Sequence, residues 1–310
     1  MDVNRHTDSP LPTDRSPVAH EDRAASDPAA DAPVARKINR ELVVMLGWAP
    51  AMLMQFTHPL VAAAIADHSV AISDPRQRTR RLQQTVCSML AFTFGTPDEA
   101  AGAARNVVGI HDRVHGKLRV SVGPYAAGTD YSAHDPELLT WVHVTLMDVL
   151  PRTYELFVGP LSDEEKARYY TEAARMEVYL QAPPDSFPRS AEDVHEHIET
   201  MRKRGALVVG SDAREAAKHV LAPIPSRAGQ LLTLPARFVT IGLTPPPFRR
   251  AYGLRWTVWH ERTFRFVAGL SRRIVPRLPS VVRHWPSARR TTVSTATTAC
   301  TRAGSGPDLT

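Results

Sequence analysis

Apolar residues recur at helical spacing along most of the chain. The clearest case opens with Asp135 and Pro136, because an aspartate N-cap followed by proline is a common start of an α-helix. The apolar residues that follow at three- and four-residue steps are Leu139, Val142, Leu146, Met147 and Leu150. This pattern predicts a helix.

Two serines mark the starts of further helices. Ser162 precedes Glu165 by three residues, which is the spacing of a capping box. Ser190 begins another helix in the same way, and Gly205 is expected to end it. The remaining predicted helices lie at 210–221 and 251–275.

Strand signals are scarce. Only 117–123 alternates apolar and polar residues, and Pro124 follows it, so we expect a short hairpin or an extended loop there. Residues 1–36, which are acidic and rich in proline and alanine, and residues 286–310 lack a hydrophobic period, so both are expected to be disordered tails. The sequence therefore predicts an all-α fold, with a single mostly helical domain at 37–285.

The uncharged apolar run at 42–66 is long enough to cross a membrane. It contains Pro50 and Pro59, however, and proline interrupts the hydrogen-bond ladder of a helix. We therefore expect two buried helices that are broken at the prolines. The first residues lack the apolar segment of a signal peptide, so we expect a cytoplasmic protein.

The composition is that of an ordinary globular protein, with 43% hydrophobic and 23% charged residues. The net charge of +6 is unevenly spread, since twelve arginines and one acidic residue, Glu261, lie from Arg249 to Arg302. Such a surplus suits contact with an anionic membrane or a nucleic acid. The sequence has no zinc finger or RNP motif, so we expect no nucleic-acid partner.

Arginines and aromatic residues interleave at 248–278. This pattern is typical either of an interfacial membrane helix or of a terminal helix that packs on the core while its arginine side chains reach water. Peripheral contact with a membrane is therefore one expectation for this segment.

Common catalytic motifs are absent, since the sequence has no GxSxG elbow, phosphate-binding glycine loop, HExxH or CxxC. Glu192 and His195 have the ExxH spacing of di-iron bundles, but no second copy exists, so a solvated helix face is expected.

Polar residues within apolar helices are the remaining candidates for chemistry. They are His58, Arg81, Thr85, His143 and Glu172. Each also has a structural explanation, because a histidine in a core helix is often only hydrogen-bonded and an arginine after a basic run often faces water. A buried arginine would need an anionic partner, since an unpaired buried charge is costly.

The segment GIHDRVHG, at 109–116, carries His111 and His115 four residues apart. On a helix the two would share one face. The spacing alone leaves three interpretations open: a metal site, one ligand beside a bystander, or two solvated residues.

Seven motifs in order resemble the mpaB-type oxygenases, a family that includes the latex-clearing proteins, which are rubber oxygenases. The resemblance runs from about Gly47 to Pro286. The motifs are HPLVAAAIADHS, DPRQRTRRLQQT, the glycine of FGT, GIHDRVHG, YSAHDPELLTWVHVTL, GPLSDEEKARYYTEA and YGLRWT.

The resemblance implies a largely helical fold that holds one b-type haem through a single histidine. In latex-clearing members this histidine follows an Arg-x-x-x-Thr pair, which here matches Arg81 and Thr85. The histidine itself matches His111, within a His-x-x-Val-x-Gly pattern, and His115 is then a bystander. Neutral imidazole is a usual ligand of haem iron. Arg81 offers a charge for a haem propionate or a donor for oxygen, and Thr85 offers a hydroxyl one turn away.

Other residues compete or assist in this scheme. His143, in the WVH stretch, is the rival iron ligand or a distal neighbour of the haem. Glu172 or His143 is expected to serve as a base, and His58 is expected to contact the cofactor. Gln83 and Gln84 offer no counterpart to the lysine before the threonine of latex-clearing proteins, so rubber cleavage is not carried over.

The sequence thus predicts a haem-b-dependent oxygenase that uses dioxygen or peroxide on a hydrophobic small molecule, for example an isoprenoid. The alternative is a non-catalytic haem- or lipid-binding module that associates with membranes through its arginine-rich C-terminal helices. A non-haem metal enzyme that uses His111 and His115 is a third hypothesis.

Overall fold

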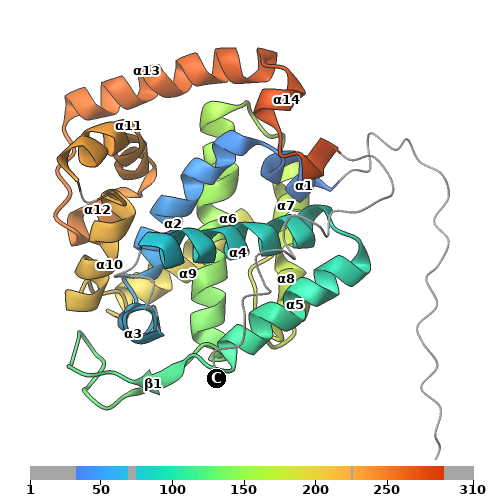
Figure 1. Cartoon of the computed structure of the whole chain (residues 1–310). Coiled ribbons are helices and arrows are strands. Elements are labelled where there is room, and N and C mark those ends of the chain that lie inside the picture. The colour runs from blue at the N-terminus through green and yellow to red at the C-terminus, as the bar shows by residue number, and fades with distance from the viewer. Residues whose placement is uncertain (1–32, 69–74, 225, 290–310) are drawn as a thin grey trace, which may run out of the picture. The chain divides into compact units, whose positions relative to one another are not determined.

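The structure, a computed structural model, describes residues 33–68, 75–224 and 226–289. These residues are largely helical and include a single two-stranded sheet, so the predicted all-α fold is confirmed (Figure 1). The predictions of disorder for residues 1–32 and 290–310 lie outside the described residues.

The elements fall on either side of a short hairpin. Before and within it are α1 (Val34–Asn39), η1 (Leu42–Gly47), α2 (Trp48–Gln55), α3 (Pro59–His68), α4 (Pro75–Phe94), α5 (Pro97–His111), β1 (His115–Lys117) and β2 (Asp130–Ser132). After it are α6 (Pro136–Phe157), α7 (Asp163–Ala174), α8 (Met176–Leu180), α9 (Ala191–Lys203), α10 (Ser211–Leu221), α11 (Arg227–Leu243) and α12 (Pro246–Ala251). The last are α13 (Val258–Ile274), η3 (Val275–Arg277), α14 (Ser280–Arg283) and η4 (Ser287–Arg289).

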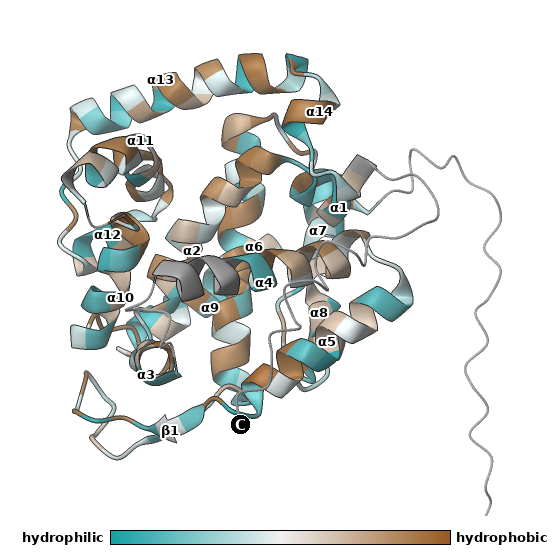
Figure 2. Cartoon of the chain, viewed as in Figure 1, coloured by the Kyte–Doolittle hydropathy of each residue, from teal (hydrophilic) through white to brown (hydrophobic). Residues whose placement is uncertain are grey.

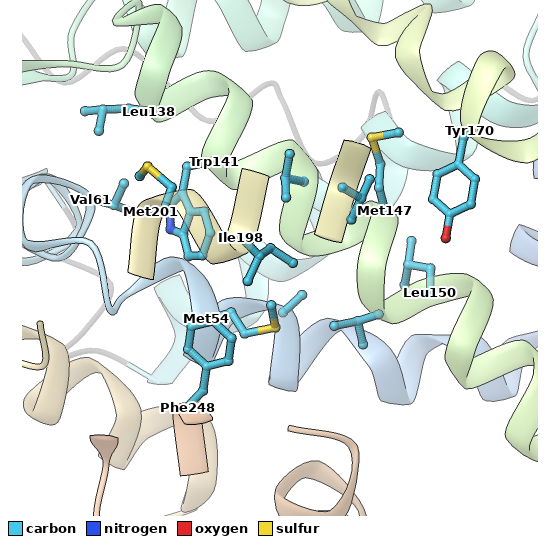
Figure 3. Close-up of a cluster of buried hydrophobic side chains, with 14 of the residues drawn as sticks. Met54, Val61, Leu138, Trp141, Met147, Leu150, Tyr170, Ile198, Met201 and Phe248 are labelled. Carbon is cyan, nitrogen blue, oxygen red and sulfur yellow. The ribbon is translucent and has the colours of Figure 1, made fainter. Parts of the chain in front are cut away.

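Helix α6 runs through the middle of the fold (Figure 1). It packs against η1, α2, α9 and α13, and its buried residues lie around most of its circumference. Figure 3 shows Trp141 and Met147 of α6 in one core with side chains of α2, α9 and α12. The indole of Trp141 also donates to the carbonyl of Gln55, at 3.2 Å. Burial of so many apolar side chains makes α6 the main source of hydrophobic stabilisation.

The predicted helix starts are confirmed by their caps. Asp135 accepts hydrogen bonds from the backbone of Glu137 and Leu138, at 2.8 and 3.4 Å. Ser162 and Glu165 form the expected capping box. Ser190 caps α9, which ends before Gly205, whose φ of 71° lies in the left-handed region.

One predicted helix is shorter than expected. The segment 251–275 was expected to be one helix, but α13 begins only at Val258. Gly253 has a φ of 69°, which ends α12, and a capping box between Thr257 and His260 then starts α13. The hydrophobic period alone does not reveal this break between α12 and α13.

The apolar run at 42–66 breaks at Pro59, as predicted, but Pro50 lies in the first turn of α2 and does not end a helix, because its missing N–H has no helical partner to lose there. Residues Leu42–Gln55 and Pro59–His68 meet at 108°, and their side chains are largely buried. Within the described ranges, no single helix is both long and apolar enough to cross a membrane. Gly47 permits the close approach to α6, because a Cβ there would lie 2.7 Å from the hydroxyl of Thr153.

The N-terminal boundary of the folded region differs slightly from the prediction. Helix α1 begins at Val34, three residues inside the arm predicted at 1–36. The backbone N–H of Ala35 donates to Glu172 of α7, at 2.8 Å, and this long-range bond gives the start of α1 a partner that local sequence does not reveal.

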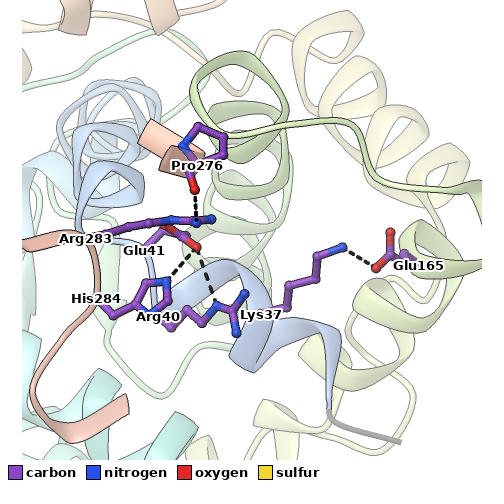
Figure 4. Close-up of polar contacts among 7 residues, drawn as sticks. All are labelled: Lys37, Arg40, Glu41, Glu165, Pro276, Arg283 and His284. Carbon is purple, nitrogen blue, oxygen red and sulfur yellow. Dashed lines mark hydrogen bonds and ion pairs between the residues drawn. The ribbon is translucent and has the colours of Figure 1, made fainter. Parts of the chain in front are cut away.

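A buried carboxylate fastens the C-terminal segment to the start of the fold. Glu41 is fully buried and accepts from the guanidinium of Arg283, at 2.6 Å, and from the ring of His284, at 3.2 Å (Figure 4). Arg40 adds a longer ion pair, at 3.5 Å. We call Glu41, Arg283 and His284 the Glu41 clamp.

Substitution Glu41→Gln should destabilise the protein by about 3–5 kcal/mol, because it removes one charge of a buried ion pair and leaves Arg283 without its partner. The free energy of unfolding in urea would measure this. The control is Glu164→Gln at an exposed site on α7, which should change stability by less than about 0.5 kcal/mol. Equal stability of both variants would contradict the role assigned to the clamp.

Candidate active-site cavity

A cavity of about 1220 Å³ lies beside α6. Helices α1 to α8 all contribute to its wall. The α6 side is a continuous apolar stripe of Leu138, Leu139, Val142, Leu146, Met147 and Leu150. The volume exceeds the roughly 300–1,000 Å³ of common ligand pockets, so the space suits a large apolar ligand or two smaller ones.

His111 lines this cavity as the last residue of α5. The helix is well defined at its start, since Thr96 and Glu99 form a capping box and Pro97 occupies the first position. At its end, Asp112 still donates its backbone N–H to Val108, so His111 keeps helical geometry. The predicted ligand therefore lies at a fixed place in the cavity wall.

The surroundings of His111 favour the neutral form of its imidazole. Burial lowers its pKa, the neighbouring His134 lowers it further, and Asp112 acts in the opposite direction. The Nδ1 atom is buried and has no hydrogen-bond partner. Leaving such a group unsatisfied costs about 1–3 kcal/mol.

His134 packs its ring against His111, with centroids 5.8 Å apart and an edge-on arrangement. Its Nε2 contacts a carboxylate oxygen of Asp112, at 2.8 Å. The pair Asp112 and His134 therefore braces the end of α5. His134 lies within the motif YSAHDPELLTWVHVTL, but it was not among the predicted site residues.

His143 also lines the cavity, from the middle of α6. Its Nε2 donates to the carbonyl of Ala173, at 2.9 Å, and its ring stacks on Phe187 with centroids 4.5 Å apart. Burial lowers its pKa to about 4, so the ring is neutral at physiological pH. Histidines that bind metals usually donate their other N–H to a carbonyl or carboxylate, and His143 meets this condition.

The Arg-x-x-x-Thr pair lies on α4. Thr85 lines the cavity together with Ser88, one turn further along. Arg81 is one turn before Thr85 on the same helix, but its side chain lies outside the described residues. The roles expected for Arg81 and Thr85 stay predictions.

Glu172 lines the cavity from α7, but its carboxylate already has partners. One oxygen accepts from the backbone of Ala35, and the other lies 3.8 Å from the guanidinium of Arg168. A base needs a carboxylate oxygen that is free to accept a proton from the substrate. The hydrogen bond from Ala35 therefore competes with the predicted role of Glu172 as a base.

His58 lies away from the cavity wall. Its ring is fully buried, and Nε2 contacts the hydroxyl of Tyr125, at 2.9 Å, and a carboxylate oxygen of Glu137, at 3.5 Å. Glu137 is also paired with Arg204. These contacts explain His58 as part of a polar cluster, and its expected contact with the cofactor has no geometric support.

His111 and His115 do not share a helix face. Helix α5 ends at His111, and His115 lies in β1 with an exposed side chain. Gly116 allows the strand to pass close to Tyr131, since a Cβ there would lie 2.5 Å from its hydroxyl. Over the described part of the chain, no group of three or more histidine, cysteine, aspartate or glutamate residues is placed to hold a metal ion.

Comparison with known proteins decides the family. Residues 35–273 match the catalytic domain of ER-bound oxygenase mpaB/B'/rubber oxygenase. The chain belongs to this family. The match covers α1 to nearly the end of α13, and therefore the whole cavity wall from Ala35 onward.

Two mycobacterial proteins are similar to this mpaB/rubber oxygenase family member. They are the uncharacterized proteins Rv2237 of Mycobacterium tuberculosis and Mb2261 of Mycobacterium bovis. Each is 26% identical over 235 residues, which cover 73% of this chain and 87% of the relative. No solved structure is a significant match. The family match establishes an oxygenase domain. It does not decide whether His111 or His143 would hold a cofactor.

The buried neutral state of His143 predicts a pH dependence of stability. Its folded pKa of about 4 lies below the unfolded value near 6.5, so only the unfolded chain takes up this proton between those values. Stability should therefore fall as the pH drops from about 6.5 to 4, by up to about 3 kcal/mol from this residue. Urea unfolding across this range would measure it.

His143→Gln should flatten this part of the stability profile, while His195→Gln, at an exposed site on α9, should leave it unchanged. An unaltered slope in His143→Gln would show that other groups cause the loss.

Proposed function

We propose that this protein is a haem-b-dependent oxygenase that oxidises a hydrophobic small molecule in the cavity beside α6. The observation that carries the proposal is His111, a half-buried imidazole that lines an apolar cavity in an oxygenase domain. Dioxygen or peroxide is the expected co-substrate.

The residues present suit a haem. An apolar cavity of about 1220 Å³ accommodates a large planar ligand, and neutral imidazole is a usual partner of haem iron. Two cations, Arg36 and Arg175, line the same cavity and offer charge to the propionates. Arg81 is a third candidate for this task, by its place on α4.

His111 is the proposed proximal ligand, braced by the pair Asp112 and His134 at the end of α5. His143 is the alternative, because its Nε2 bond to Ala173 fixes the ring and leaves Nδ1 with a lone pair. In the first arrangement His143 would contribute a neutral polar group from α6 to the cavity wall.

Haem supplies the redox chemistry by which the co-substrate is activated. Apolar side chains of α4, α5 and α6 would give a bound substrate a largely apolar environment. The hydroxyl groups of Thr85 and Ser88 would orient a polar end of the substrate. The long apolar stripe of α6 orients a hydrophobic chain, and an isoprenoid is the substrate class that the family suggests.

The visible spectrum tests the proposal directly. Purified protein supplied with haem should show a Soret band, and His111→Ala should lose or strongly shift it. His143→Ala should keep it, because His143 is not the proximal ligand in this scheme. His115→Ala is the matched control, since this histidine is four residues away and exposed on β1.

Loss of the band only in His143→Ala would assign the ligand to α6 instead. A protein that binds none of the supplied haem would refute the haem-dependent oxygenase proposal and favour a module that binds an apolar ligand without turnover.

Removal of the Thr85 hydroxyl should slow turnover without loss of haem. Thr85→Val keeps the shape of the side chain, and one hydrogen bond is worth roughly 0.5–1.5 kcal/mol, so we expect a two- to tenfold lower rate. Isoprenoid-stimulated dioxygen uptake would measure it, beside the Soret absorbance.

Thr93→Val is the control, because Thr93 lines the cavity two turns further along α4 and its hydroxyl contacts the sulfur of Met89, at 3.8 Å. Equal rates for both variants would remove Thr85 from the proposed chemistry.

A further inference from the structure

Helix α13 carries two separate apolar stripes. The inner stripe contains Phe264 and Ala268, which are buried against the fold. Ser271 continues it, and its hydroxyl donates to the carbonyl of Phe157 at the end of α6, at 3.2 Å. The inner stripe therefore packs α13 against the rest of the molecule, and His260 and Glu261 add contacts to Trp256 near its start.

The outer stripe faces away from the fold. It consists of Trp259, Phe266, Val267, Leu270 and Ile274, and we call it the docking stripe. Trp259 and Phe266 are 74% and 71% exposed, although large aromatic side chains are usually covered. Steps of seven, four and four residues from Trp259 to Ile274 keep these side chains on one face of a helix. In Figure 2, α13 forms an outer edge of the fold, with apolar and polar residues alternating along it.

The exposed apolar surface continues past the end of α13. Leu278 is 40% exposed, and Val281 and Val282 of α14 are 67% and 62% exposed. The exposed apolar side chains between Val258 and Val282 thus form a run, whereas most surface apolar side chains are scattered singly.

Arginines accompany the docking stripe. Arg262 lies over the ring of Trp259, 5.4 Å from its centroid. Arg272 and Arg273 form no ion pair with any described residue, and Glu261, the one acidic residue of α13, is already paired with Arg265. The helix therefore presents an apolar strip with uncompensated positive charge.

We propose that the docking stripe inserts into the interface of a lipid bilayer that contains anionic headgroups. A helix with exposed tryptophan, phenylalanine and leucine and with arginines beside them has the composition of an interfacial helix. The charge complements anionic lipids. A second copy of the chain fits less well, because a two-fold contact would bring two sets of unpaired arginines together. The proposal does not depend on the reaction in the cavity.

The Glu41 clamp connects this surface with the cavity. Glu41 lies two residues after the end of α1, and its partners Arg283 and His284 directly follow the exposed valines of α14. Helix α1 in turn lines the cavity with Ala35, Arg36 and Asn39. A bilayer at the docking stripe would thus also lie close to α14, which Glu41 links to the residues that follow α1.

Flotation of the full-length protein with vesicles tests the proposal. The protein should float with vesicles of phosphatidylcholine that contain phosphatidylglycerol, and far less with phosphatidylcholine alone. Binding should fall steeply at about 1 M salt, where charges are screened within roughly 3 Å. Phe266→Asp should lower the bound fraction by about tenfold or more, since it places a charge in the apolar strip.

Two further variants keep the test decisive. Val120→Asp makes the same kind of change at an exposed valine in the loop between β1 and β2, and it should leave the floating fraction unchanged. Arg272→Gln with Arg273→Gln leaves the apolar strip unchanged and should lower binding to anionic vesicles by about tenfold. Thermal unfolding of each variant would show that the fold is retained.

Failure of the wild-type protein to float would overturn the proposal. A protein that is dimeric in sedimentation, does not float, and becomes monomeric with Phe266→Asp would assign the docking stripe to a second copy instead. Equal flotation of wild type and Phe266→Asp would also refute it.

Discussion

The burial of α6 on nearly every side is the constraint on which the rest of this structure depends. A helix of 22 residues with apolar side chains around its circumference is stable in water only when other helices cover it. One side is covered by direct packing, with Trp141 in the core shared by α2, α9 and α12. The opposite side faces the cavity. The same helix is therefore both the centre of the core and the longest wall of the site.

Uncharged polar side chains buried on such a helix need a hydrogen-bond partner. His143 satisfies this requirement through the carbonyl of Ala173, and Thr145 does so through the carbonyl of Val142, at 2.7 Å, and the amide of Gln55. His111 differs, because its Nδ1 is buried without a partner. Together with its place in the cavity wall, this buried atom without a partner distinguishes His111 from the hydrogen-bonded His143 among the described residues.

Local signals predicted the fold well and the site in part. Capping residues such as Asp135 and Ser162 act within one turn, so their effect is visible in the sequence. The start of α13 was missed because it depends on the left-handed conformation of Gly253, which a hydrophobic period does not report. The family resemblance predicted that His111 and Thr85 belong to one site, and both line the cavity.

The remaining residues of the site depend on contacts between distant parts of the chain. Glu172 was expected to serve as a base, yet it accepts a hydrogen bond from Ala35, 137 residues earlier. His58 was expected at the cofactor, but its ring contacts Tyr125, which is 67 residues later in the sequence, in a polar cluster outside the cavity wall. Helical spacing identifies which side chains are unusual, but only the tertiary structure decides which partner each one finds.

The Glu41 clamp has a similar long-range character, and it explains why a carboxylate can be buried so close to the cavity. Burial of Glu41 without partners would be costly, and Arg283 and His284 offset that cost only if α14 stays in place. The clamp thus couples the stability of α1 to the position of α14. Since α1 lines the cavity and α14 continues the exposed apolar surface, this buried charge joins the segment that follows α1 to the segment that ends α14.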